Sequence, residues 1–232
     1  MSERSDAGPA DGDSPVEPKR KPERRWPMAA AVLAAAGLQV ITPREGRLPA
    51  WWVIPIVEVA MLVILIARDP GRIDKRSVAL RRQTIFLIGF MTAATIGGVI
   101  RLSWQILDGT SRVSAGALLG RGAGVWITNV IVFSLWYWEL DRGGPAERAA
   151  AAPIEPSFVF PEDGIPERVA EGWMPQYPDY LYLAFSTGTA FSATDTAPVR
   201  MWAKMTLLLE SSLSLVIAVL VVARAINVLP GS

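Results

Sequence analysis

Residues 179–224 read DYLYLAFSTGTAFSATDTAPVRMWAKMTLLLESSLSLVIAVLVVAR. The first seven residues form an amphipathic stretch that is too short to cross a bilayer, and the next thirteen are small and rich in hydroxyl groups. A long apolar run follows at 203–228. A short helix, a polar turn and a long helix are typical of a re-entrant loop, because non-helical backbone at membrane depth must be buried in protein or line a cavity. The stretch therefore predicts a helical membrane protein.

The composition supports this class and excludes much familiar chemistry. Of the 232 residues, 51% are hydrophobic and only 19% are charged, against about 25% charged in soluble domains. The chain has no cysteine and no histidine, which removes thiolate sites and imidazole catalysis. We therefore expect no enzyme activity, no catalytic residues, no metal site and no cofactor. A net charge of +1 without a basic aromatic surface also predicts no nucleic-acid partner.

Four apolar runs precede the quoted stretch, at 27–42, 49–67, 84–107 and 124–138. A membrane-spanning helix needs about 20 predominantly apolar residues. With the last run they predict an all-α, polytopic membrane bundle of about five transmembrane helices, plus the short re-entrant helix and loop. We expect a multi-pass protein of the cell membrane, with the lipid bilayer as its surroundings.

The sequence divides into four regions. Residues 1–26 lack apolar periodicity and predict a disordered tail. The four-helix membrane region follows at 27–138, and a Pro-rich acidic loop at 139–178. The last region, 179–232, holds the re-entrant segment and the final helix.

Polar residues inside the apolar runs are candidates for function, because ionisable groups at membrane depth are costly. They are Glu58, Arg101, Asn129 and Glu210. Glu58 and Arg101 are predicted to lie at similar depth on antiparallel neighbours, where they form either a structural ion pair or part of a proton relay. Gly89, Ala93 and Gly97 recur every four residues, a spacing that favours close helix packing in lipid.

The pattern Phe185-x-Thr187-x-Thr189, followed by Asp195-x-x-Pro198, resembles the pore loop of tetrameric potassium channels. The helix after it is similar to the inner helix of the small two-helix channels. The resemblance implies a homotetramer that passes a monovalent cation. The residues that would line its path are Thr187, Thr189, Ala190, Phe191, Ser192, Ala193, Thr194 and Asp195.

The potassium-channel filter reads Thr-Val-Gly-Tyr-Gly-Asp, whereas this chain has Ala190 to Asp195 at those positions, with Ser192 and Thr194 in place of both glycines. Those glycines permit the backbone conformations that aim carbonyl groups at the ion. Two functions therefore stay open: an oligomeric small-cation channel, or a non-conducting membrane scaffold or accessory protein. A secondary transporter that uses Glu58, Arg101 and Glu210 is a third.

A second resemblance covers more of the chain. Trp126-x-Thr128-Asn129, together with the run from Trp136 to Pro145, looks like a signature of an uncharacterised family of bacterial, actinobacterial-type multi-pass membrane proteins. This resemblance implies the helical architecture and carries no activity with it.

Two rules predict opposite orientations for the re-entrant loop. The basic loop at 68–83 and the acidic loop at 139–179 are separated by two crossings, so they are predicted to share a side of the membrane. The excess of Lys and Arg places that side in the cytoplasm. A potassium-channel pore loop enters from outside instead.

Overall fold

The computed structural model describes residues 22–42, 51–71, 73, 77–107, 114–150, 154–165, 173–192 and 195–228. It is mostly helical, which confirms the predicted all-α class. The elements, in order, are α1 Trp26–Ile41, α2 Val53–Arg68, α3 Val78–Leu107, α4 Ala115–Leu140, η1 Asp141–Gly143, α5 Pro145–Ala149, β1 Phe158–Val159, η2 Pro161–Gly164, α6 Tyr177–Ala190, β2 Ala197–Pro198 and α7 Met201–Val228.

Among the described residues, three helices are long and apolar enough to cross a membrane: α3, α4 and α7. They have 30, 26 and 28 residues, so each is longer than the roughly 30 Å hydrocarbon core at about 1.5 Å per residue. Helices α1 and α2 have 16 residues each, about 24 Å. Helix α1 matches the predicted run of 27–42 to within one residue at each end, whereas α2 begins four residues later than the predicted run of 49–67.

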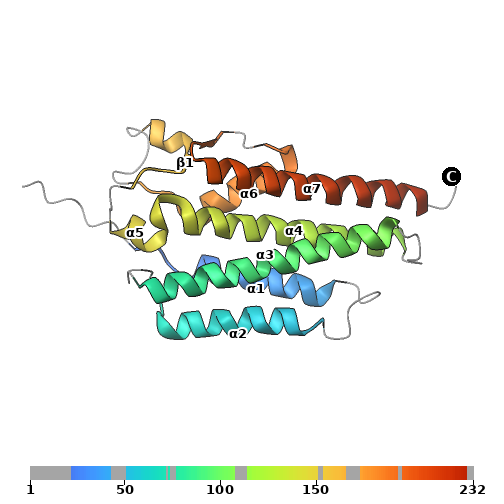
Figure 1. Ribbon diagram of the computed structural model, residues 1–232, viewed down its shortest axis with the longest axis horizontal. Coiled ribbons are helices and arrows are strands. Elements are labelled where there is room, and N and C mark those ends of the chain that lie inside the picture. The colour runs from blue at the N-terminus through green and yellow to red at the C-terminus, as the bar shows by residue number, and fades with distance from the viewer. Residues whose placement is uncertain are drawn as a thin grey trace, which may run out of the picture.

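Helix α4 is the central element of the bundle, and it packs against α1, α3, α6 and α7. Figure 1 shows α7 on one side of α4 and the α2 helix at the opposite edge of the molecule, beyond α3 and α1. The aromatic side chains of Phe133, Tyr137 and Trp138 are fully buried on α4. The core is therefore centred on the second half of this helix.

One end of the bundle collects the starts of α1, α3, α6 and α7 and the ends of α2 and α4 (Figure 1, left). Arg25 forms an ion pair with Asp69 at 2.5 Å, and Arg81 lies 3.6 Å from the carboxylate of Glu139. These contacts tie the segment before α1 to the loop after α2, and α3 to the last turn of α4. The ends of α2 and α4, which lead into the basic and acidic loops, therefore lie at the same end of the bundle (Figure 1); the side of the membrane that the loops share stays a prediction.

The segment after α4 forms an ordered cap over this end. Asp141 is fully buried, and its Oδ1 accepts hydrogen bonds from the backbone N–H groups of Ser157 and Phe158. Its Oδ2 accepts from the Tyr180 hydroxyl at 2.7 Å. β1 then pairs antiparallel with β2, with Phe158 opposite Pro198. The predicted acidic loop therefore contains short elements that join α4 to α6 and α7.

The disordered tail predicted for residues 1–26 includes, at its C-terminal end, residues that contact the bundle. Residues 1–21 lie outside the described residues, but Glu23 contacts the cap. Its carboxylate accepts hydrogen bonds from Trp138 Nε1 at 2.9 Å, from Arg148 at 3.3 Å and from the Tyr177 backbone N–H at 2.6 Å. Three donors from two helices and the cap hold one carboxylate in place, a long-range arrangement that local composition does not reveal.

The small residues on α3 do not mark a close helix contact, so this packing prediction is wrong. A Cβ added at Gly89 or Gly97 would meet nothing within 4 Å. The close approach lies elsewhere, at Gly122 of α4, where an added Cβ would lie 2.6 Å from a methyl group of Val221 on α7. Of the three small residues on α3, Ala93 and Gly97 line a cavity and Gly89 lies outside it.

Candidate functional site

Helix α6 begins with a cap supplied by its own first turn. The backbone N–H of Gln176 donates to Asp179 Oδ2 at 2.7 Å, and Pro178 occupies the first turn, where no amide donor is needed. Burial raises the pKa of the Asp179 carboxyl above its usual value; the hydrogen bond from Gln176 opposes the rise and the charge of Glu162 adds to it. The cap therefore loses its charge at a higher pH than an exposed aspartate would.

The helix lies in the groove between α4 and α7, and a glycine permits this close contact. A Cβ added at Gly188 would lie 3.3 Å from Ser214 Oγ on α7 and 3.3 Å from a methyl group of Val130 on α4. The Gly188 carbonyl accepts a hydrogen bond from Trp126 Nε1 at 3.4 Å. Near the other end of α6, the Tyr177 hydroxyl bonds Ser134 of α4 at 2.9 Å.

After α6 the chain turns back toward the capped end. Phe191 ends the helix in the left-handed conformation, with φ 57° and ψ 19°, and six residues later the chain pairs with β1. The helix itself has 14 residues, about 21 Å. A short helix followed by a segment that returns to the same end is the order that the sequence predicts, and the place of this segment in a membrane stays a prediction.

The predicted path-lining residues divide between the interior and the surface. Thr187 is buried, with 1% of its surface exposed, and lies inside the bundle. The others that are described lie at the surface of the single chain: Thr189, Ala190, Phe191, Ser192 and Asp195. Ala193 and Thr194 lie outside the described residues. The Asp195 carboxylate accepts from the Tyr182 hydroxyl at 3.4 Å. This segment therefore faces away from the bundle rather than into it.

Asn129 and Glu210, predicted from separate helices, meet at the interface of α4 and α7. Glu210 is fully buried, and one of its carboxylate oxygens accepts a hydrogen bond from the Tyr137 hydroxyl at 2.5 Å. Asn129 Nδ2 donates to Ser214 Oγ at 3.1 Å and to the Glu210 carbonyl at 3.4 Å. This polar cluster joins the two helices and is closed to the surface, so it does not line a path.

The predicted meeting of Glu58 and Arg101 is wrong. Both carboxylate oxygens of Glu58 accept from Gln39 Nε2 of α1, at 2.9 and 3.0 Å, and among the described residues no ion pair joins Glu58 to Arg101. The contact between Arg68 of α2 and Gln83 of α3 sets the register of the two helices. From there Glu58 is about 15 Å along α2, whereas Arg101 is about 27 Å along α3.

The charged residues of the transporter hypothesis therefore lie in three separate places. Glu58 is between α1 and α2, and Glu210 is between α4 and α7. Arg101, which is on α3, lines a cavity. No shared proton relay connects them. In the part of the chain that the structure describes, no three carboxylates cluster as metal ligands would.

Two partners of the predicted residues were missed, Gln39 and Tyr137. Tyr137 follows Asn129 by eight positions, which places both side chains on one face of α4. That spacing could have linked the tyrosine to the polar cluster. Gln39 gives no such signal, because only the pairing of α1 with α2 brings it to Glu58.

No protein-family model matches this chain, and no curated protein or solved structure is significantly similar to it. The resemblance to potassium-channel pore loops therefore depends on the sequence between Phe185 and Pro198.

Proposed function

We propose that the protein is a multi-pass protein of the cell membrane whose copies, as a homotetramer, surround a shared path for a small monovalent cation. Each chain would contribute α6 and the segment that returns from it. The observation that carries the proposal is the position of this segment on the outside of the chain's own bundle.

The exposed return segment needs a cover if it lies at membrane depth. Between Phe191 and Thr196 the described backbone is neither helix nor strand, and Phe191, Ser192 and Asp195 are exposed. Lipid offers no partner for such a backbone, so irregular segments persist only in protein or beside water. Other copies of the chain, arranged around a central aqueous path, supply both surroundings.

Helix α7 supports assembly with a regular apolar stripe. Twelve of its described residues are exposed, and eight of these recur in steps of three and four along the whole helix, all of them apolar except Ser212: Met201, Met205, Leu208, Ser212, Leu215, Val219, Val222 and Ile226. An average step of 3.5 residues is the spacing at which long helices pack with a left-handed crossing. In a potassium-channel-like assembly this helix would lie beside the path.

The packing of α1 and α2 supports five crossings. Helix α1 packs on α2 and α4, and α2 packs on α3. Trp26, Trp51 and Trp52 lie next to the ends of α1 and α2. Tryptophan rings are enriched at the headgroup region of a membrane, so their positions fit the ends of membrane spans. With α3, α4 and α7, these two helices would make the five-helix membrane unit.

A non-conducting scaffold is the second function that an observation favours. Among the described residues other than glycine, only Arg142 and Phe191 have positive φ. Ser192, at the position of the first filter glycine, therefore does not take the left-handed backbone that glycine permits. The side chain of Phe191, 43% exposed, stands at the same turn. A protein with this turn would keep the fold without a potassium-selective filter.

Cation flux from liposomes tests the two functions. We expect the purified wild type to release potassium or sodium down a gradient, and Asp195→Asn to reduce the rate. Glu155→Gln is the matched control, because this carboxylate is at the same end and its side chain is 90% exposed. No wild-type flux with any monovalent cation, from a protein that is still oligomeric, would overturn conduction and favour the scaffold.

The assembly itself is tested by disulfide trapping, since the wild type has no cysteine. Ser192→Cys should form covalent dimers between copies on oxidation in membranes, because four copies of this position would surround one axis. Val63→Cys on α2 is also exposed but lies at the opposite edge of the bundle, and it should stay monomeric. Equal trapping of both variants would contradict the proposed arrangement.

Labelling with a membrane-impermeant maleimide decides the orientation. Glu155→Cys lies at the capped end, and Gly116→Cys lies at the start of α4, where an added Cβ meets nothing within 4 Å. If the charge rule holds, Gly116→Cys reacts in intact cells and Glu155→Cys only after lysis. The reverse result would mean that the return segment enters from outside the cell, as the pore loop of a potassium channel does.

A further inference from the structure

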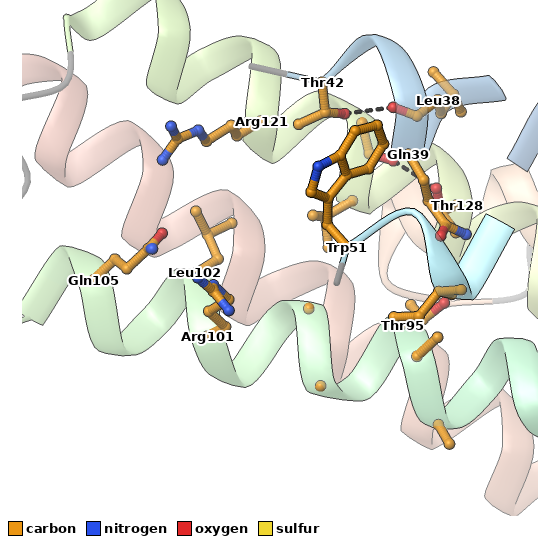
Figure 2. Close-up of a pocket in the computed structure, with 17 residues that line it drawn as sticks. Leu38, Gln39, Thr42, Trp51, Thr95, Arg101, Leu102, Gln105, Arg121 and Thr128 are labelled. Carbon is orange, nitrogen blue, oxygen red and sulfur yellow. Dashed lines mark hydrogen bonds between the residues drawn. The ribbon is translucent and has the colours of Figure 1, made fainter. Parts of the chain in front are cut away.

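At the end of the bundle opposite the cap, a cavity of about 520 Å³ separates α1 and α2 from α3 and α4. This volume is in the range of small-molecule sites, which are mostly apolar with a few polar groups. Its apolar wall includes Leu38, Ile54, Leu102 and Val125. Figure 2 shows Trp51 in the middle of the cavity, with Thr95 and Thr128 toward one side and Arg101, Gln105 and Arg121 toward the other.

Among the described residues, two arginines line this cavity and no carboxylate does. Arg101 precedes the last residue of α3 by six positions, and Arg121 follows the first residue of α4 by six. Because these helices are antiparallel neighbours, both side chains start about 9 Å from the helix ends. Two guanidinium groups at one depth make the cavity positive where headgroups meet acyl chains.

Arg101 is the more informative of the two cations. Within the described part of the chain, no hydrogen bond or ion pair involves its side chain. A guanidinium inside a membrane is costly without a partner, and phosphate oxygens match its donors well. Gln105, one turn further along α3, adds another polar side chain to the same wall.

The cavity opens sideways along α3 rather than only at the end of the bundle. Its lining residues Ala93 and Gly97 are exposed, and they lie 14 and 10 residues from the last residue of α3, about 21 and 15 Å. An opening at that depth faces acyl chains, so it admits a lipid more readily than a free anion from water.

We propose that this cavity binds an acidic phospholipid, with its phosphate on Arg101 and Arg121 and an acyl chain along the apolar wall. Basic pockets between transmembrane helices recognise anionic headgroups in this way. The site is separate from the return segment after α6, so lipid binding does not depend on whether the protein conducts.

Native mass spectrometry of the detergent-purified protein tests the site with three probes: phosphatidylglycerol, phosphatidylcholine and inorganic phosphate. We expect phosphatidylglycerol to bind most tightly. Arg101→Gln should weaken it about fivefold, the effect of one cation near a membrane surface, and should leave phosphatidylcholine unchanged. Arg101→Lys should keep most of the affinity.

A cavity-filling pair provides the steric control. Gly98→Leu projects into the cavity, whereas Gly89→Leu lies on the same helix outside it, and an added Cβ at either position meets nothing within 4 Å. We expect Gly98→Leu to lose bound phosphatidylglycerol and Gly89→Leu to retain it. Equal binding of both lipids to the wild type, or unchanged binding to Arg101→Gln, would overturn the proposal. If inorganic phosphate binds as tightly as phosphatidylglycerol, the site recognises a free phosphate and the proposal of a lipid ligand is overturned.

Discussion

Helices α4 and α7 are both long and apolar, yet they occupy opposite kinds of position. In the most apolar stretch of α4, 67% of the residues are buried inside the protein, whereas in that of α7 only 28% are. The more hydrophobic of the two, α7, is the less buried. Hydropathy does not predict burial here because lipid is as apolar as the protein core. What distinguishes α4 is its aromatic and polar side chains, which contact partners on three other helices, α3, α6 and α7.

The largest expected effect comes from separating these two helices. Gly122→Leu would place a side chain against Val221, where even a Cβ comes within 2.6 Å. Overpacking of this kind costs about 1–3 kcal/mol in the free energy of unfolding. Thermal unfolding followed by circular dichroism in detergent measures the loss.

Gly120→Leu is the matched control for that substitution. It lies on the same helix, half a turn away, and a Cβ there meets nothing within 4 Å. We expect its free energy of unfolding to stay within about 0.5 kcal/mol of the wild-type value. If both variants unfold alike, the close contact of α4 with α7 at this level is not formed.

An effect of similar size is expected from the polar cluster that joins the same helices. Tyr137→Phe removes the hydroxyl that donates to the buried Glu210, and a buried acceptor without its donor costs about 1–3 kcal/mol. Tyr182→Phe removes an exposed hydroxyl with a 3.4 Å contact to Asp195 and should leave the stability nearly unchanged. Chemical denaturation of both variants in the same detergent gives the comparison, and equal losses would contradict it.

The smallest effect on the single chain is expected on the outward stripe of α7. Leu215 is 47% exposed. Leu215→Ala should therefore change the free energy of unfolding of the chain in detergent by no more than about 0.5 kcal/mol. In membranes the same substitution should lower the fraction of cross-linkable oligomer, if the stripe packs on other copies. An unchanged oligomer would show that this face of α7 contacts lipid.

Much of the fold could be predicted from the sequence because length and apolarity are local properties. The apolar runs and the presence of a short helix before the last one follow from the order of residues, although α6 continues to Ala190, five residues into the stretch predicted as a turn. The shared end of the basic and acidic loops follows as well, since two antiparallel helices return the chain to the side it left. The start of α2 was less predictable, because the apolar residues 49–52 precede its first helical residue, Val53.

The partners of the buried polar residues were decided only by the tertiary structure. Glu58 contacts Gln39 rather than Arg101, because α3 is almost twice as long as α2 and carries Arg101 past its end. Glu210 and Asn129 meet because α4 and α7 pack along most of their lengths. The sequence by itself determined which segments are helical and apolar, since these properties depend on neighbouring residues. The offsets between helices determined which side chains meet and where a cavity stays open, since these depend on packing across the bundle.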